Sequence, residues 1–468
     1  MKADSGFKFR EINEELLITN EVGDYDFFAN DTVERFFKNN LTAEELRQFE
    51  DLSILIGEEK WKYYSLARRL HEKYEPRNRS IGYLILIPTL RCNLSCSYCQ
   101  VSRAPEKAKG FDWSKDSLER YESFLSEHGA DHLKIEFQGG EPSLRLDLLE
   151  DIISITKNHT ETCEFVICSN MVNLDQKLLH LLETENFSIS TSIDGSMSTM
   201  TKNRTFEDDI SEKIFNNFNY ILDNYGAEKI AALPTITENQ INNPREIIET
   251  YVNFGFQSIF LRPVNYMGFA RKQHADASNA IDDWNKFYFE ALNIIKEYNK
   301  EIYFEEFYLA MLVREIFSSA RRSFVDYRSP SRFLNNYAVI DFDEKIYPSD
   351  EARMLSRTRH IDLSMGSMQE GIDENKATEL NYWAENQTHH DCIHCVYQSF
   401  CGNDIVDDIS RYKRFDIPKK DTWYCNRQIA LFDFIFSKVQ AQDKEWLNIF
   451  SKWIQRSGNS KNIYQFFK

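Results

Sequence analysis

Three cysteines at a short spacing offer the most specific chemistry in the chain. Cys92, Cys96 and Cys99 follow the pattern C-x3-C-x2-C, directly after the apolar run of residues 83–88. We expect that run to be a buried strand, which places the thiols on the loop at its carboxyl end. Four thiolates would close a tetrahedral zinc or iron site, whereas three can hold only three corners of a [4Fe–4S] cluster. The open iron can take the amino and carboxylate groups of a methionine-like ligand; the alternatives are a zinc knuckle or separate buried thiols.

A second cysteine group lies nearer the carboxyl end. Cys392, Cys395 and Cys401 have the spacing C-x2-C-x5-C, and Cys425 follows after 23 intervening residues. Four thiolates can ligate an iron–sulfur cluster completely, but four-thiolate zinc sites use similar spacings, so both metals are open here. Nearby histidines could replace a thiolate or could be solvated loop residues, namely His389, His390 and His394.

Strand-like and helix-like stretches alternate from residue 83 onward, as in parallel sheets connected by helices. We predict strands over 83–88, 132–137, 163–168, 187–192, 229–235 and 257–262. We predict helices near 115–128, 145–158, 174–184, 208–224 and 244–254, with a long helix over 279–299. The pattern indicates an α/β fold, a partial (β/α)6 TIM-like barrel over residues 81–315, with its chemistry on the loops at the carboxyl ends of the strands. Cys163 and Cys168, on the third strand, are expected to be core residues.

A small α+β module is predicted in front of the barrel, over residues 1–80. Residues 16–19 and 25–28 flank Asn20-Glu21-Val22-Gly23 and predict a β-hairpin. Thr42 and Glu45 form a capping-box pattern at the start of a helix, and residues 61–74 are a further amphipathic helix. A hairpin followed by short helices resembles the peptide-recognition modules at the front of peptide-modifying enzymes, which bind a leader peptide at a sheet edge. The alternative is an extension that only covers the barrel.

Composition limits the possible partners. The net charge of −18 lacks the basic footprint of a nucleic-acid-binding protein. No apolar run reaches membrane-spanning length, and residues 1–5 carry no apolar signal region, so we expect a cytoplasmic protein. The nine cysteines, mostly at short spacings, fit metal ligands in a reducing compartment better than disulfides.

The cysteine trio, with the aromatic Tyr98 before its third cysteine, resembles the radical S-adenosylmethionine (radical SAM) superfamily. Gly139-Gly140-Glu141-Pro142 follows about 40 residues later at a strand end, in the order that relatives show. The resemblance implies that this element receives the amino group of SAM, that Ser190, Ser192 and Asp194 lie near its ribose and carboxylate, and that Arg204 pairs with the carboxylate. The implied cofactor contacts are Tyr98, Gln138, Gly139, Gly140, Glu141, Asn170, Ser190, Ser192, Asp194, Arg204 and Leu261, the last against adenine.

The second cysteine group resembles the auxiliary-cluster domain called SPASM, or its shortened form, twitch, here over residues 316–468. The full pattern has two further cysteines, at the positions that Ser349 and Ile405 occupy. Both missing ligands belong to the same cluster. The resemblance therefore implies one auxiliary [4Fe–4S] cluster, held by Cys392, Cys395, Cys401 and Cys425, and two clusters in all.

Over nearly its full length the chain is similar to the His-Xaa-Ser-system radical SAM maturases, B type. The features are residues 19–25, residues 98–103, residues 261–263 with 268–270, and residues 350–355. This likeness implies an oxidoreductase that abstracts hydrogen from a small ribosomal precursor peptide and forms a cross-link or another oxidative modification. It also implies a partner radical SAM maturase and a low-potential electron donor.

One carboxylate is a candidate catalytic base. Asp350, with Glu351 beside it, matches the aspartate proposed as the base in relatives that oxidise a serine or cysteine side chain; the alternative is a solvated turn carboxylate. Two other functions stay open, namely a sulfatase-type formylglycine-forming enzyme that acts on a protein serine or cysteine, and a non-catalytic iron–sulfur protein for peptide binding or electron transfer.

Overall fold

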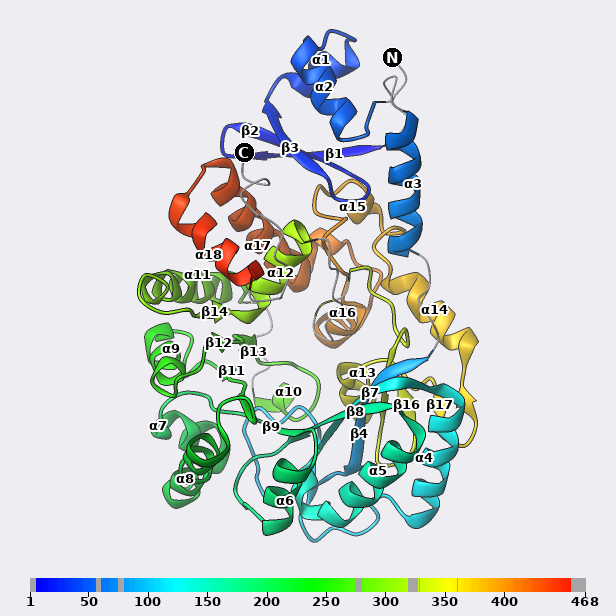
Figure 1. Cartoon of the computed structure of the whole chain (residues 1–468), viewed down its shortest axis with the longest axis vertical. Coiled ribbons are helices and arrows are strands. Elements are labelled where there is room, and N and C mark those ends of the chain that lie inside the picture. Colours follow the sequence, from blue (N-terminus) through cyan, green and yellow to red (C-terminus); the bar gives the residue numbers. More distant parts are fainter. Residues whose placement is uncertain are drawn as a thin grey trace.

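The protein was analysed as a computed structural model that describes residues 6–55, 60–74, 80–273, 280–318, 327, 329–359 and 361–455. Residues 1–5 and the first residue of the helix predicted over 279–299 lie outside this part. A three-stranded sheet with short helices lies at one end of the long axis, and a parallel sheet with its helices lies at the other (Figure 1). No helix in the described part is long and apolar enough to cross a membrane.

The central element is a seven-stranded sheet with the order β10-β9-β8-β7-β4-β15-β16, parallel except for β16. Its strands are Ile81–Thr89 (β4), Gly129–Gly139 (β7), Thr162–Cys168 (β8), Phe187–Thr191 (β9), Ile230–Ala232 (β10), Tyr337–Ile340 (β15) and Ile346–Tyr347 (β16). β4 is buried continuously from Leu84 to Thr89, because both faces of a parallel sheet are covered. The predicted α/β class with a parallel sheet is confirmed.

Helices connect these strands at the predicted places. They are Lys115–His128 (α4), Leu146–His159 (α5), Gln176–Thr184 (α6), Asp208–Tyr225 (α8), Pro244–Asn253 (α9) and Ile281–Tyr298 (α11). Shorter turns are Pro142–Arg145 (η1), Met197–Met200 (α7), Thr201–Thr205 (η2) and Ala270–Gln273 (α10). Each long helix buries an apolar stripe in the main hydrophobic core, as its periodicity predicts.

The sheet differs from the prediction at its two ends. The stretch predicted as a sixth strand is divided into β12 (Ser258–Ile259) and β13 (Arg262–Pro263), which pair with β14 (Glu305–Glu306) and β11 (Thr235–Ile236) outside the main sheet. On the opposite side, β15 and β16 extend the sheet beyond β4. The first predicted strand is therefore an interior strand of the sheet.

The N-terminal module contains one strand that was not predicted. Its elements are Phe7–Ile12 (β1), Glu15–Asn20 (β2), Tyr25–Ala29 (β3), Thr32–Phe37 (α1), Ala43–Asp51 (α2) and Lys60–Tyr74 (α3). β2 and β3 form the predicted hairpin, and β1 pairs with the other side of β2. The capping box is present: the Thr42 hydroxyl accepts from the Glu45 amide, and the Glu45 carboxylate accepts from the Thr42 amide.

Helices dominate the C-terminal region. They are Phe307–Phe317 (α12), Asp350–Arg357 (α13), Glu374–Ala384 (α14), His390–Ile393 (α15), Ile405–Tyr412 (α16), Trp423–Gln440 (α17) and Lys444–Gln455 (α18), with a small ribbon of Gly366–Ser367 (β17) and Gly371–Ile372 (β18). The N-terminal module packs against α17, where Arg10 forms a two-fold hydrogen-bonded ion pair with Asp433 at 2.8 Å. Tyr25 meets Phe436 edge to face, with ring centroids 5.0 Å apart.

Candidate active site

A cavity of about 220 Å³ opens at the carboxyl ends of β4, β7, β8 and β9. It gathers most residues that the sequence predicts for one site. Those that line it are Cys92, Tyr98, Cys96, Cys99, Gln138, Gly139, Gly140, Glu141, Asn170, Ser190, Ser192, Arg204 and Asp350. Residues from separate strand ends therefore converge on one space, as expected for loops at the carboxyl edge of a parallel sheet.

The three thiols of the first cysteine group share this cavity. Burial raises the pKa of Cys92 to about 12, and Glu141, Cys96 and Cys99 add electrostatic repulsion. Burial also raises the pKa of Cys96, against the opposing effect of Arg204. Three thiolates would repel one another here, so they need a cation or a cluster to hold them together.

Two glycines allow the cysteine loop to lie directly against the end of β7. Gly139 has φ +138°, and a Cβ on it would lie 2.1 Å from the carbonyl oxygen of Thr89. A Cβ on Gly140 would lie 2.3 Å from the carbonyl oxygens of Leu90 and Arg91. Glycine at these two positions therefore lets the backbone before the first cysteine lie directly against the end of β7.

Glu141 fixes the neighbouring strand ends. It is 1% exposed, and its carboxylate accepts hydrogen bonds from the Asn170 amide at 2.7 Å, the Ser169 hydroxyl at 3.0 Å and the Ser143 hydroxyl at 2.6 Å. Burial raises its pKa, and these hydrogen bonds oppose the rise. Its carboxylate is therefore engaged within the protein, which makes Glu141 a positioning residue for the walls of the cavity.

Tyr98, Asp194 and Arg204 form a buried polar network behind the cysteine loop. The Tyr98 hydroxyl donates to Asp194 at 2.7 Å and accepts from Arg204 at 2.9 Å. Asp194 is fully buried and is not among the residues that line the cavity; it accepts the hydrogen bond that orients Tyr98. Arg204 does line the cavity, and its Nε has no acceptor among the described residues. That N–H is suited to a ligand carboxylate.

Asp350 lies in the same cavity, at the start of α13. Its carboxylate accepts from Arg353 Nε at 3.0 Å. Burial raises its pKa, Arg353 opposes the rise, and Glu136 adds repulsion. A buried carboxylate with a raised pKa beside a cavity has the properties of a general base.

The cavity is also lined by residues that were not predicted as site residues, among them Glu136 and Cys168. Glu136 projects from β7 and accepts from Gln138 Nε2 at 2.6 Å and from the Cys168 thiol at 3.2 Å. Cys168 was expected in the core but lines the cavity, because it is the last residue of β8. Cys163, at the other end of β8, packs against the core as expected.

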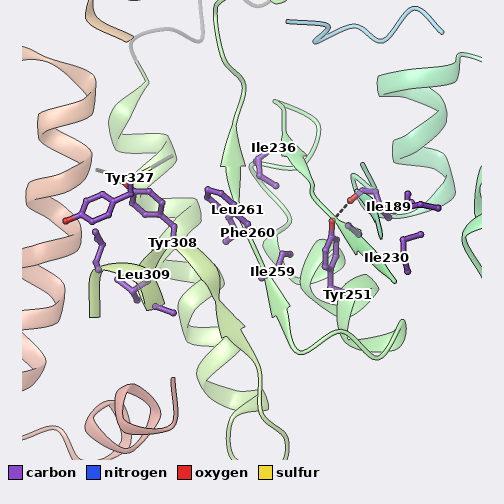
Figure 2. Close-up of a cluster of buried hydrophobic side chains, with 14 of the residues drawn as sticks. Ile189, Ile230, Ile236, Tyr251, Ile259, Phe260, Leu261, Tyr308, Leu309 and Tyr327 are labelled. Atoms are coloured by element: carbon purple, nitrogen blue, oxygen red, sulfur yellow. Dashed lines mark hydrogen bonds between the residues drawn. The ribbon is translucent and has the colours of Figure 1, made fainter. Parts of the chain in front are cut away.

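Like Asp194, the predicted site residues Leu261 and Glu351 do not line this cavity. Leu261 is fully buried and packs among apolar side chains (Figure 2), while Arg262 and Pro263, the next two residues, line the cavity. Successive side chains in an extended segment point to opposite faces, so Leu261 and Arg262 cannot both face the ligand. Glu351 lines a second, adjoining cavity, because consecutive helical residues such as Asp350 and Glu351 point in different directions.

The second cysteine group is brought together by α15, α17 and the loop between α15 and α16. Burial raises the pKa of Cys392 to about 12, followed in effect by repulsion from Cys425 and Cys395. The pKa of Cys401 is raised by burial and by repulsion from the other three thiols of the group. The four thiols therefore lie within electrostatic range of one another, as a shared metal site requires.

The neighbouring polar residues behave as structural groups. His389 donates through Nε2 to the Trp383 carbonyl oxygen at 2.7 Å, and His390 and His394 are exposed. Ser349 caps α13 by accepting from the Ala352 amide, and Ile405 is 1% exposed in an apolar cluster. Within the described residues, no compact group of three or more His, Cys, Asp or Glu side chains is arranged to hold a single metal ion.

The first cavity fits a [4Fe–4S] cluster with an open iron together with an amino-acid ligand. The three thiols supply three iron ligands, and the buried Nε of Arg204 supplies a donor without an acceptor in the described part of the chain.

Comparison with known proteins supports the resemblance that the sequence motifs show. Residues 86–242 match the family described as Radical SAM superfamily. An uncharacterized protein of Methanocaldococcus jannaschii is 24% identical over 210 residues, which are 44% of this chain and 69% of that protein. The mitochondrial GTP 3′,8-cyclase of Arabidopsis thaliana is 26% identical over 197 residues, which are 40% of this chain and 46% of the cyclase, so the chain spans less than half of that enzyme.

Two solved structures share the overall fold of this chain. Native anSMEcpe with bound AdoMet superposes with a TM-score of 0.62 at 18% identity, over 81% of this chain and 100% of that chain. The same protein with bound AdoMet and Cp18Cys peptide gives a TM-score of 0.62 at 18% identity, over 81% and 99% of the two chains. A radical SAM domain implies S-adenosylmethionine and a [4Fe–4S] cluster, which the cavity fits. Residues 86–242 are therefore a radical SAM domain, within a chain that shares the overall fold of anSMEcpe.

Proposed function

We propose that the chain is a radical SAM peptide maturase that oxidatively modifies a ribosomally made peptide, forming a cross-link or another new bond. One observation carries the proposal: the cysteine trio, Arg204 and Asp350 line a single cavity. When bound, the cluster and SAM supply a 5′-deoxyadenosyl radical that abstracts a hydrogen atom from an unactivated carbon. The chain's own residues then have to place the substrate, exclude water and remove a proton.

Each of these tasks has a candidate residue. Arg204 offers its unpartnered Nε to the carboxylate of SAM, and Tyr98 holds the guanidinium in place from behind. Net two-electron oxidation of the peptide removes one hydrogen atom, one proton and one electron. Asp350 is the acceptor that we propose for the proton, since its pKa is raised by burial and it faces the cavity.

The second cysteine group would hold the acceptor of the remaining electron. We propose one auxiliary [4Fe–4S] cluster with four protein ligands, because Ser349 and Ile405 stand where the SPASM pattern has two more cysteines. Lys8 and Arg10 of β1 lie near Cys395 and lower its pKa against the dominant effect of burial. This positive charge would stabilise a reduced, more negative cluster.

The N-terminal module supports a peptide substrate. Its β-β-β-α-α-α order places β3 at one edge of the small sheet, and among the described residues no further strand pairs with that edge. Trp61 and Tyr64 of α3 are 62% and 70% exposed. We propose that a leader peptide adds a strand at β3 and contacts these aromatic side chains. In the neighbour of known structure, a peptide and AdoMet are bound together.

The test is anaerobic reconstitution with iron and sulfide, followed by reaction with SAM, a strong reductant and the small peptides encoded beside this gene. We expect about eight irons per chain, four for each cubane cluster, and release of 5′-deoxyadenosine. Cys96→Ala should abolish turnover while peptide binding persists. Absence of SAM cleavage in the reconstituted chain, or product formation by Cys96→Ala, would contradict the proposal and favour a non-catalytic binding or electron-transfer role.

A formylglycine-forming reaction is the second candidate. Oxidation of a serine or cysteine side chain needs a base that faces the cavity, and Asp350 lies in that position. Product chemistry separates the two reactions. A serine-derived aldehyde reacts with carbonyl reagents, whereas a cross-linked peptide that has lost two hydrogens does not.

A further inference from the structure

A second chamber of about 110 Å³ adjoins the SAM cavity on the side of the C-terminal helices. Arg262, Pro263 and Asn265 line both spaces, so the two share one wall. The opposite wall comes from α16 and α17, with Asp404, Asp407, Arg411, Tyr424 and Arg427. A group held in this chamber would therefore lie next to the SAM cavity.

Arg427 is the unusual residue of this chamber. It is 8% exposed, and no hydrogen bond or ion pair joins its guanidinium to any residue that the structure describes. Its carbon Cζ lies 4.0 Å from the ring centroid of Tyr308, and Trp423 is 5.8 Å away. Stacking covers the face of the guanidinium and leaves its N–H edge for binding, since the donors lie in its plane.

Three tyrosines and then Glu306 act electrostatically on Arg427, and the Glu306 carboxylate is already engaged. Glu306 is fully buried and accepts hydrogen bonds from the Tyr288 hydroxyl and from the amides of Leu261 and Leu309. Burial raises the pKa of Glu306 to about 7. It therefore does not act as a dedicated counter-ion for Arg427.

A second arginine in the same chamber shows the ordinary arrangement. Arg411 donates through Nε to both carboxylate oxygens of Asp407 at 2.8 Å, and it also stacks on Trp423 at 4.2 Å. Arg411 therefore carries its own carboxylate within the wall, whereas Arg427 does not. A buried charge that lacks a partner among the described residues is costly, so the donors of Arg427 are available to an anionic group from outside the chain.

We propose that Arg427 is the anchor for a carboxylate of the substrate, either an aspartate or glutamate side chain or the carboxyl terminus of the peptide. This inference rests on the proposed function for the substrate being a peptide. A carboxylate on Arg427 forms a two-fold hydrogen-bonded pair, which fixes orientation as well as position. Tyr327 and Tyr308, which lie side by side in Figure 2 with centroids 6.0 Å apart, flank the site with aromatic surface. Asp404 and Glu351, in the same chamber, can accept from the amide or cationic groups of the flanking peptide.

The test measures binding of small carboxylates to the reconstituted full chain by ligand-observed nuclear magnetic resonance. The probes are N-acetyl-glutamic acid α-amide for a side-chain carboxylate, N-acetylglycine for a terminal one, and N-acetyl-glutamine α-amide as the neutral analogue. We expect one of the two carboxylates to bind with a dissociation constant of about 1 mM. Arg427→Met should weaken carboxylate binding at least about 30-fold, and Arg427→Lys should weaken it less. Lys444→Met is the control: it removes an exposed charge at the start of α18 and should leave the affinity unchanged.

Three results would overturn the inference: equal binding of the neutral analogue, unchanged binding by Arg427→Met, or no binding of either carboxylate. The thermal midpoint checks the fold of Arg427→Met, which should equal or exceed that of the wild type because an unpaired buried charge is removed. SAM cleavage by the wild-type chain without peptide is measured in parallel. Its absence contradicts the proposed function, whereas intact cleavage without carboxylate preference contradicts only the role of Arg427.

Discussion

The Tyr98 hydroxyl joins two charged groups beside the SAM cavity, and its removal should destabilise the radical SAM domain. Tyr98→Phe deletes one oxygen from a side chain that is 9% exposed and leaves the ring in place. The hydroxyl bridges two ionic groups, donating to Asp194 at 2.7 Å and accepting from Arg204 at 2.9 Å. Without it, Asp194 Oδ2 keeps one hydrogen bond in the described part of the chain, from Asn203 Nδ2 at 3.4 Å.

The expected cost follows from the charge of the partners. A hydrogen bond to a charged group contributes about 1.5 to 3 kcal/mol, so the loss of two should lower the free energy of unfolding by about 3 kcal/mol or more. Tyr121→Phe is the matched control, because the fully buried Tyr121 hydroxyl shares one neutral hydrogen bond of 2.8 Å with Thr156. That deletion should cost about 1 kcal/mol.

Urea unfolding of both variants and the wild type, without reconstitution, measures the difference directly. Both tyrosines lie in the radical SAM domain and both variants lose one oxygen, so equal slopes allow the midpoints to be compared. The midpoint of Tyr98→Phe should fall about three times as far as that of Tyr121→Phe. Equal shifts would mean that the Tyr98 network contributes no more than a neutral buried hydrogen bond, and our account of how Arg204 is held would be wrong.

Three further changes test other parts of the structure. Gly140→Ala puts a Cβ 2.3 Å from the Leu90 carbonyl oxygen, so it should lower the free energy of unfolding by more than about 3 kcal/mol and reduce the iron content. Gly6→Ala is the control, because the nearest atom to its Cβ lies 3.5 Å away and its stability should be unchanged. Cys425→Ala should lower iron from about eight to about four per chain in a colorimetric assay, with the loss confined to one cluster signal in electron paramagnetic resonance. Burial raises the pKa of Glu306 to about 7, so Glu306 stabilises the fold fully below the ordinary pKa of a glutamate, and this stabilisation is lost as pH rises through 7. Between pH 4 and pH 8, the free energy of unfolding of Glu306→Gln in urea should rise by about 3 kcal/mol relative to that of the wild type. Parallel pH profiles of the two proteins would contradict the burial argument.

Local patterns predicted much of the radical SAM domain because its elements are long and regular. α4 occupies residues 115–128, as its apolar periodicity predicts, and β4 and β8 lie within a few residues of their predicted bounds. The first cysteine group and the Gly-Gly-Glu-Pro element were predicted to meet, and the shared cavity brings them together, since carboxyl ends of neighbouring parallel strands lie on one edge.

Pairing between distant segments could not be predicted in the same way. β15 joins β4 across about 250 residues of sequence, and nothing in a four-residue apolar run states which strand it will pair with. Cys168 was assigned to the core because β8 is apolar, yet the last residue of a strand reaches the edge of the sheet where ligands bind. Arg427 is unusual because its guanidinium has no hydrogen-bond or ion-pair partner among the described residues. A local sequence pattern cannot reveal this, because it depends on which segments meet in three dimensions.

The second chamber lies between the two positions at which the SPASM pattern would have further cysteines. Ser349 lines the chamber, and Ile405 is flanked by Asp404 and Val406, which line it too. In this chain Ser349 caps α13 and Ile405 packs in an apolar cluster, so neither offers a metal ligand. The same region presents Asp350 to the SAM cavity and Glu351 to the chamber from consecutive positions of one helix. The chamber therefore offers polar side chains beside the SAM cavity, at the place where the SPASM pattern would supply the ligands of a further cluster.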